Sequence, residues 1–258
     1  MAEDAKGKQQ YADYDIACIP AKLGDPIALA QQTAKNACLR LGSRKIKTQQ
    51  CPVLFSAPLA SRLLSVFLQA INGAAIYRDN SFLKGAVGEA IFPEFVSLIQ
   101  EPHVKRNLYS SPFDSEGVRT QEYAIVDKGC FDQYICNSYS ARKLGCQTTG
   151  NAGGVFNVNV THTDHSLDDL LQEMDCGLYV TELLGQGVNI LTGDYSRGAY
   201  GFWVENGEIQ YPVDEVTIAG NLREMYQHII AIGHNIDRRC NVKTGAILIE
   251  KMTVAGND

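Results

Sequence analysis

The chain has 258 residues, 45% of them hydrophobic, and its 29 acidic residues outnumber 23 basic ones to give a net charge of −6. An acidic balance without a basic stripe does not favour binding to DNA through phosphate neutralisation, so we expect no direct nucleic-acid partner. No apolar run is long enough to span a bilayer, and the first residues are too polar for a secretory signal. We therefore expect a cytoplasmic protein with no membrane partner.

The chain contains eight cysteines but no Cys-x-x-Cys pair. In a protein that is not exported, thiols remain reduced. Cys38, Cys51, Cys130 and Cys136 lie in apolar or strand-like surroundings, so the sequence predicts thiols that are free and mostly buried.

Two segments precede the first apolar strand. Residues 1–14 are polar and offer too little apolar surface to offset chain entropy, which predicts a disordered or frayed arm. A helix is then predicted over 25–41, with Asp25 as N-cap, Pro26 at its first position and Gly42 after its end. Its apolar residues recur at helical spacing, so we expect this helix to pack on something through that stripe.

The next pattern is a short strand followed by a strongly apolar helix. Residues 51–55 predict the strand, and Ser56 is the expected cap of the helix, which ends before Gly73. Leucine and phenylalanine recur along this helix on more than one side, which is typical of a buried element.

From residue 86 onward the pattern becomes β-rich. Strands over 123–126 and 130–135 flank a three-residue loop that ends in a glycine, which predicts a hairpin. A short helix is expected over 138–144. The glycine-rich loop at 149–154 lacks the spacing of a phosphate-binding motif.

His162-Thr163-Asp164-His165 is the most tempting metal-binding pattern, because two imidazoles and a carboxylate are close in sequence. The pattern that follows favours another interpretation. Ser166 with Asp169 three residues later predicts the N-cap of a helix over 167–174. We therefore interpret the histidine motif as a solvated loop.

The stretch 187–213 organises the rest of the chain, and a strand over 177–184 leads into it. In its second half, apolar and polar residues alternate on both sides of Asn206-Gly207, which predicts a β-hairpin. Its first half carries glycines at 187, 193, 198 and 201. These glycines bracket the polar run Asp194–Arg197, which suggests a lined cleft. The alternative is a glycine-rich connection whose polar residues merely face water.

The last elements are a helix capped by Asn221 that ends at Gly233 and a strand over 245–252. Together the patterns predict an α+β protein dominated by antiparallel sheet, arranged as a sandwich or an open barrel with helices packed on its faces. We divide the chain into an arm with the linking helix, 1–46, and one domain, 47–258.

Six motifs that follow one another over most of the chain carry a family resemblance. They are Ser110–Val118, Asn137–Gly145, Thr181–Asn189, Thr192–Ala199, Gly201–Ile209 and Thr217–Leu222. In this order they closely resemble the C-terminal domain of the PmbA/TldE family. That family provides the companion subunit of the TldD–TldE metalloprotease, and older descriptions call its members modulators of DNA gyrase. Members usually carry a further N-terminal α+β domain, for which we expect no counterpart within these 258 residues.

The resemblance also implies that this chain holds no metal. In TldD-like chains, the helix that corresponds to residues 59–72 carries a His-Glu-x-x-x-His motif, in which the imidazoles hold zinc and the Glu is the general base. Here that segment contains neither His nor Glu, and the cysteine that completes the TldD-like site corresponds to Thr244. We therefore expect no catalytic residue and no cofactor in this chain, with zinc held by a TldD-like partner.

By resemblance, the chain is the non-zinc-binding subunit of a heterodimeric cytoplasmic metalloprotease, with a homodimer as the form expected when it is alone. The implied substrates are small or unfolded peptides, including peptide-antibiotic precursors and antitoxins. We expect an extended peptide to add to the edge of the glycine-flanked strand. The candidate peptide or partner contacts are Gln186, Asp194, Tyr195, Ser196 and Arg197. Two alternatives remain, an autonomous peptidase with an unrecognised site and the direct modulation of DNA gyrase.

Overall fold

Five strands of the larger sheet close into a barrel. The structure, a computed structural model, describes residues 1–5 and 7–256. The strands follow the order β10-β9-β8-β3-β13, and β13 returns to β10 by pairing Thr253–Ala255 with Thr217–Ala219. Their bounds are β3 (Gln49–Phe55), β8 (Gly177–Leu184), β9 (Asp194–Glu205), β10 (Glu208–Asn221) and β13 (Ile247–Ala255). The β3–β8 pair is parallel and the other pairs are antiparallel. The predicted α+β class with mainly antiparallel strands is confirmed, and the barrel is closed.

A second sheet lies beside the barrel, in the order β12-β7-β4-β5-β6. Its strands are β4 (Leu98–Gln100), β5 (Tyr123–Asp127), β6 (Cys130–Phe131), β7 (Val158–Val160) and β12 (Val242–Lys243). All of them are short, and only the β12–β7 pair is parallel. A further strand, β11 (Ile229–Ile232), extends the larger sheet along the half of β13 that β10 leaves uncovered.

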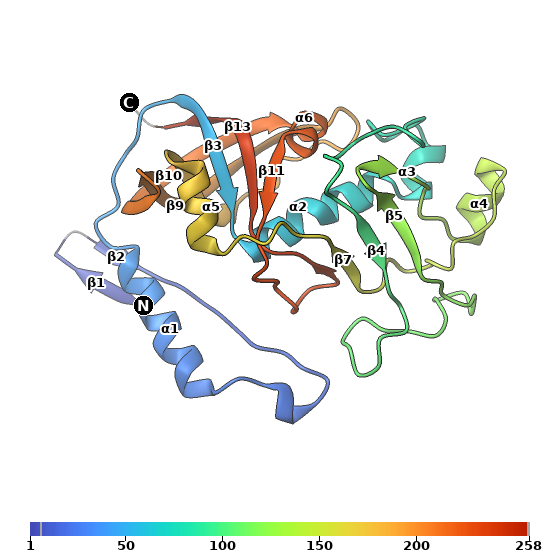
Figure 1. Ribbon diagram of the computed structural model, residues 1–258, viewed down its shortest axis with the longest axis horizontal. Coiled ribbons are helices and arrows are strands. Elements are labelled where there is room, and N and C mark those ends of the chain that lie inside the picture. Colours follow the sequence, from blue (N-terminus) through green and yellow to red (C-terminus); the bar gives the residue numbers. More distant parts are fainter. Residues whose placement is uncertain (6, 257–258) are drawn as a thin grey trace.

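Helix α2 (Ala57–Ala70) runs between the two sheets (Figure 1). Eight of its fourteen residues are buried, because its apolar residues face both the barrel and the second sheet. Leu64 and Phe67 have no exposed surface, and both belong to the main hydrophobic core. Burying an apolar side chain of this size contributes roughly 1.5–3 kcal/mol. The apolar helix predicted from the sequence is therefore the central element of the core.

An aromatic cluster surrounds Phe67. Its ring meets those of Phe92, Phe131 and Tyr226 edge to face, at centroid distances of 5.0, 5.9 and 5.7 Å. Such pairs add about 0.5–1.5 kcal/mol each beyond their burial. The hydroxyl of the fully buried Tyr226 donates to the carbonyl of Leu63 at 3.1 Å. Residues from α2, the second sheet and α6 (Leu222–Gln227) thus meet at one point.

Most predicted helix ends and turns are confirmed. The helices α4 (Ser138–Leu144) and α5 (Leu167–Met174) begin with reciprocal capping boxes at Asn137 and Ser166. Gly145 ends α4 in a left-handed conformation, with φ of 70°. Asn206 and Gly207 also have positive φ, as the tight turn between β9 and β10 requires.

Three local predictions are wrong. The strand expected over 130–135 ends at Phe131. The β5–β6 hairpin pairs Asp127 with Cys130, so its loop contains two residues rather than three, and Lys128 and Gly129 both have positive φ. The helix expected to reach Gly233 ends at Gln227, and Ile229–Ile232 forms β11 instead. Isoleucine suits a strand, and the edge of β13 supplies the hydrogen bonds that a longer helix would otherwise make.

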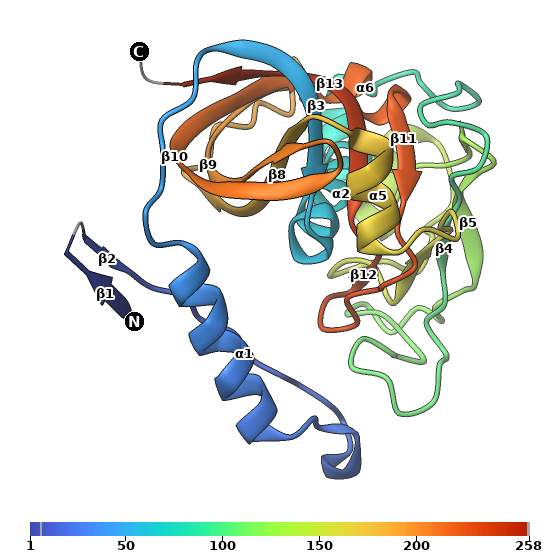
Figure 2. The same cartoon turned by 60° about the vertical axis from the view of Figure 1, so that its left-hand side comes forward.

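The first 46 residues differ from prediction in two respects. Within the predicted disordered arm, β1 (Ala2–Asp4) and β2 (Gly7–Gln9) form an antiparallel hairpin. They are followed by the 3-10 helix η1 (Pro20–Lys22) and by α1 (Pro26–Leu39), which Asp25 caps as predicted. Figures 1 and 2 show the arm extending away from the barrel. Only Ala37 of α1 is buried, so the packing expected of its apolar stripe does not form.

One further short helix, α3 (Gly73–Tyr77), was not predicted and begins at an Asn72 cap directly after α2. None of the helices in the described residues is long and apolar enough to cross a membrane.

We predict that Phe67→Ala lowers the free energy of unfolding by roughly 3–5 kcal/mol, because it leaves a cavity at the centre of the aromatic cluster. The matched control is Phe113→Ala, since Phe113 is 59% exposed, and its effect should stay within about 0.5 kcal/mol. Urea unfolding followed by circular dichroism measures both values. Equal losses in the two variants would contradict the central place of Phe67.

Candidate functional site

The predicted binding run lies at the start of β9, which has neighbours on both sides. Along one edge, Asp194 to Arg197 pair with the end of β10. Along the other edge, the amide of Ser196 donates to the carbonyl of Gly187 at 2.7 Å, and Asn189 donates to the carbonyl of Asp194 at 2.9 Å. An extended peptide cannot add to a strand whose backbone groups are already paired. The predicted edge addition at this strand is therefore wrong.

Glycine is required where the segment before β9 meets the start of β9. A Cβ atom on Gly187 would lie 1.7 Å from the carbonyl oxygen of Ser196. The segment before β9 can approach the strand this closely only because residue 187 has no side chain. The glycines of this stretch therefore serve a close contact between parts of the chain itself.

The five candidate residues are not equally accessible. Gln186, Asp194 and Ser196 are exposed, whereas Tyr195 is 2% exposed. The Tyr195 ring points into the barrel and meets Phe55 edge to face at 6.5 Å. Burial raises the pKa of its phenol to about 12. Tyr195 is therefore part of the core and cannot contact a peptide or a partner without unfolding.

Arg197 lies at the rim of the barrel and holds the turn after β8. Its Nη2 donates to the carbonyl of Gly185 at 2.5 Å, and its Nε donates to the carbonyl of Leu184 at 3.4 Å. The guanidinium thus positions the backbone next to Gln186. We use the name rim surface for the exposed Gln186, Asp194 and Ser196 together with the half-buried Arg197, which lies on the other face of β9 from Asp194 and Ser196 and contacts the backbone before Gln186.

Helix α2 and the segment around Thr244, which the resemblance is expected to match to the metal-binding segments of TldD-like chains, lie side by side. Ser61 of α2 donates its hydroxyl to the carbonyl of Val242 in β12 at 2.8 Å, two residues from the fully buried Thr244. Thr244 donates to the carbonyl of Gly245 at 3.2 Å. Among the described residues, no buried side-chain nitrogen or oxygen lacks a hydrogen-bond partner. Zinc is held by imidazole, thiolate or carboxylate groups, so the residues at this junction do not fit a zinc ion.

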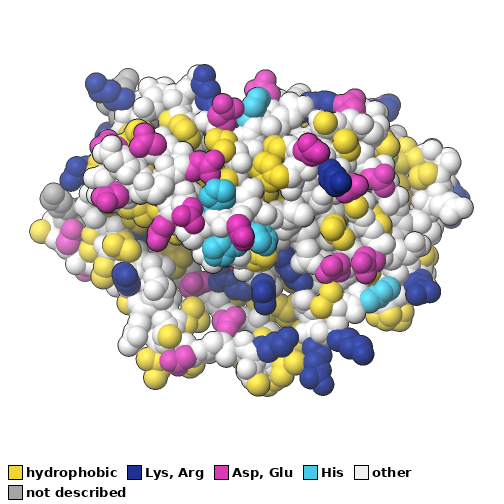
Figure 3. Space-filling view, viewed as in Figure 1, with side chains coloured by type: hydrophobic (Ala, Val, Ile, Leu, Met, Phe, Trp, Pro, Cys, Tyr) yellow, Lys and Arg dark blue, Asp and Glu magenta, His cyan; other side chains and the backbone are white. Residues whose placement is uncertain are grey.

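The histidine motif before α5 makes ordinary surface contacts. His165 Nε2 lies 3.3 Å from a carboxylate oxygen of Glu173, and His165 Nδ1 lies 2.8 Å from the hydroxyl of Thr163. Figure 3 shows histidine side chains beside acidic ones on this face. Within residues 1–5 and 7–256, no group of three or more His, Cys, Asp or Glu side chains is placed to hold a metal ion.

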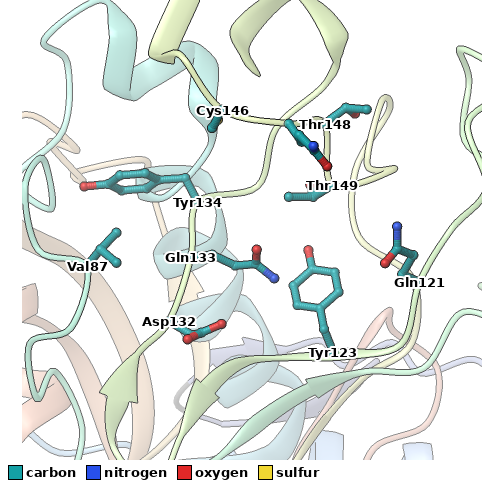
Figure 4. Close-up of a pocket in the computed structure, with 10 residues that line it drawn as sticks. Val87, Gln121, Tyr123, Asp132, Gln133, Tyr134, Cys146, Thr148 and Thr149 are labelled. Atoms are coloured by element: carbon teal, nitrogen blue, oxygen red, sulfur yellow. The ribbon is translucent and has the colours of Figure 1, made fainter. Parts of the chain in front are cut away.

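Sequence reasoning missed a cavity of about 420 Å³ beside α4 (Figure 4). Its lining comes from four separate segments: Val87; Gln121 and Tyr123; Asp132–Tyr134; and Cys146–Thr149. Burial raises the pKa of Tyr123 to about 12, and its hydroxyl donates to Asn151. No sequence signal pointed to this cavity, because no motif joins segments so far apart in the chain.

Comparison with known proteins supports the resemblance inferred from the six motifs. Residues 48–256 match the family model described as the PmbA/TldA metallopeptidase C-terminal domain. A protein named metalloprotease PmbA homolog, from Haemophilus influenzae, is 47% identical over 246 residues, which cover 95% of this chain and 54% of that protein. The chain thus spans about half the length of the curated relatives it matches.

Solved structures share the fold. One from Thermotoga maritima, described as a putative modulator of a DNA gyrase, has a TM-score of 0.90 and 32% identity, over 98% of this chain and 60% of that one. TldE from Thermococcus kodakarensis has a TM-score of 0.78 and 26% identity, over 89% of this chain and 55% of that one.

The buried phenol of Tyr195 predicts a loss of stability at alkaline pH. Its pKa in the folded chain is about 12, above the value near 10 of an exposed tyrosine. The folded state therefore binds the proton more tightly, and stability present below pH 10 is lost as the pH rises towards 12. We expect Tyr195→Phe to reduce this loss by about 1–3 kcal/mol, measured by urea unfolding at pH 9 and pH 11.5. An unchanged pH dependence would contradict the burial of this phenol.

Proposed function

The chain belongs to the PmbA/TldA metallopeptidase family, and we propose that within it this chain is a subunit that binds no metal and acts by pairing with a zinc-bearing, TldD-like subunit. The proposed complex is a cytoplasmic protease of small or unfolded peptides, including peptide-antibiotic precursors and antitoxins. In this complex the partner supplies the zinc and its general base, and this chain supplies binding surface.

The observation that carries the proposal is the donor set at the junction of α2 and β12. A metal site built from both α2 and β12 would require these two elements to be in contact. They are in contact, since Ser61 bonds directly to Val242. The hydroxyls of Ser61 and Thr244 already donate to backbone carbonyls, and the buried ammonium group of Lys243 in β12 donates to Asn157. A junction of this composition stabilises the packing of α2 and offers no ligand of the kind that zinc prefers.

The rim surface is the part of the predicted site that remains open to a partner or a peptide. Asp194, Ser196 and Gln186 present a carboxylate, a hydroxyl and an amide from a backbone that is rigidly paired. Rigid presentation lowers the entropy lost on binding, which favours polar recognition. Because both edges of β9 are occupied, we propose recognition through these side chains rather than through strand addition.

Metal content and peptidase activity test whether the zinc and the catalytic activity belong to the partner subunit rather than to this chain. We expect the isolated chain, purified in the presence of zinc, to contain far less zinc than protein and to cleave no peptide. Co-expression with a TldD-like subunit should give a complex, separable by size-exclusion chromatography, that contains stoichiometric zinc and loses peptidase activity to a chelator. Stoichiometric zinc and chelator-sensitive cleavage in the isolated chain would overturn the proposal and favour an autonomous peptidase.

Arg197→Ala tests the rim surface. Removal of the guanidinium frees the Leu184–Gly185 turn beside Gln186, and we expect the dissociation constant of the complex, or of a bound peptide, to rise roughly tenfold, about 1.4 kcal/mol. Arg142→Ala is the matched control, because Arg142 is exposed on α4. Calorimetric titration gives the affinities, and circular dichroism checks the fold. A folded Arg197→Ala chain with unchanged affinity and activity would exclude this role.

A further inference from the structure

The cysteines are more exposed than the sequence predicted. All eight are free, only Cys51 and Cys136 are buried, and five are exposed: Cys18, Cys38, Cys130, Cys146 and Cys176. The prediction that most thiols are buried is therefore wrong. One exposed sulfur lies beside a buried one, since Sγ of Cys146 is 4.0 Å from Sγ of Cys136.

The buried member of this pair is firmly placed at the end of α2. The neighbouring Ile135 accepts a hydrogen bond from Gly73 at 2.8 Å and donates to Ile71 at 3.1 Å. The carbonyl of Cys136 accepts from the amide of Thr149 at 3.0 Å. A Cβ atom on Gly73 would lie 2.8 Å from the Cys136 sulfur, so this sulfur packs directly on the start of α3.

The exposed member lies at the other end of α4. Gly145 ends the helix, and the amide of Cys146 donates to the carbonyl of Ala141 at 3.0 Å, which brings the chain back towards Cys136. The Cys146 side chain also lines the cavity of about 420 Å³, directly before Gln147 and Thr148 (Figure 4). Its backbone is held, whereas the residue as a whole is exposed.

We propose that Cys136 and Cys146 are a redox-active pair that forms a reversible disulfide across the two ends of α4. A disulfide has a sulfur–sulfur distance of about 2.0 Å, so the two sulfurs must approach by about 2 Å. Rotation of the exposed Cys146 side chain supplies this movement, because the Cys136 sulfur is confined by Gly73 and Ser140. The proposal is independent of the metal content and partner of the chain.

A low-molecular-weight disulfide such as oxidised glutathione is the oxidant. The Cys146 thiolate attacks one glutathione sulfur, which breaks the glutathione disulfide and releases one glutathione thiolate. The Cys136 thiolate then attacks the Cys146 sulfur and releases the second glutathione thiolate. The two protons lost by the cysteines end on the two glutathione thiols, so two cysteine thiols and one disulfide give one new disulfide and two thiols.

Burial raises the pKa of the Cys136 thiol to about 11. Its thiolate is therefore scarce near neutral pH, and the second step should limit the rate. Because only the thiolate attacks, this step should accelerate roughly tenfold for each pH unit between pH 7 and pH 9.

The disulfide would tie the surface end of α4 to the end of α2 and turn the Cys146 side chain away from the cavity. Gln147, Thr148 and Thr149 follow directly and line the same cavity. The oxidation state of the Cys136–Cys146 pair thus sets the shape of the cavity wall formed by residues 146–149.

Peptide mapping tests the proposal in the full chain. The background is Cys130→Ser with Cys176→Ser, because both residues are exposed, and trypsin then yields peptides 129–142 and 144–197 with one cysteine each. The folded protein is incubated with oxidised glutathione, alkylated and digested without reductant. We expect the two peptides to appear cross-linked, and the cross-link to disappear on treatment with dithiothreitol.

Two single variants in this background separate the steps. With Cys136→Ser we expect glutathione to remain on Cys146, whereas with Cys146→Ser we expect Cys136 to stay reduced because it is buried. Circular dichroism confirms that each variant is folded. The proposal is overturned if, at pH 9 and after the reaction has reached equilibrium, the unaltered pair holds as much glutathione on Cys146 as the Cys136→Ser variant does, or if Cys146 links to a different cysteine.

Discussion

The burial of α2 between the barrel and the second sheet is the constraint on which the rest of this structure depends. The helix follows β3 directly, and its residues Leu64 and Phe67 are fully enclosed. A helix that is apolar on more than one side is stable only if both of its sides are covered. The barrel covers one side and the short strands of the second sheet cover another, while the Tyr226 hydroxyl bonds to the helix backbone at Leu63. The two sheets are therefore parts of one core.

The neighbours of β9 decide what the candidate binding stretch can do. A strand at the edge of a sheet could accept a peptide backbone. Here β10 and the segment around Gly187 occupy both of its edges. The alternation of a strand then sends Tyr195 into the core and leaves Asp194 and Ser196 outside. The polar side chains of Asp194 and Ser196 remain available for recognition on a rigid strand, and Arg197 bonds to the adjacent turn at Gly185.

The junction of α2 with β12 relates this chain to its family. The helix and the strand remain in direct contact, but Ser61 and Thr244 satisfy their hydroxyls on backbone carbonyls. The Ser61 hydrogen bond joins the helix to β12, and neither hydroxyl is a ligand of the kind that zinc prefers. The side chains available for binding or reaction lie elsewhere, on the rim surface and around the cavity where Cys146 approaches Cys136. Both places are anchored to the same core, the first through β9 and the second through the end of α2.

Features that depend on hydrogen bonds between residues close in sequence could be predicted from the sequence alone. The capping box at Ser166 and the turn at Asn206-Gly207 belong to this class, because each is stabilised within a few residues. The helix after residue 55 could be predicted from the spacing of its own apolar residues, although distant segments stabilise it. The family motifs could also be recognised without coordinates, since they are strings of adjacent residues.

The predictions that failed concern partners that are distant in the chain. Ile229–Ile232 became a strand because β13 offered it an edge, whereas the stripe of α1 remained largely exposed, because only Ala37 of this helix is buried. The inward direction of Tyr195, the cavity beside α4 and the approach of Cys146 to Cys136 likewise exist only after α2 and the two sheets have packed together. The sequence by itself determined most of the elements and the family. Only the tertiary structure decided which side chains are exposed, because burial depends on which distant segments cover each face.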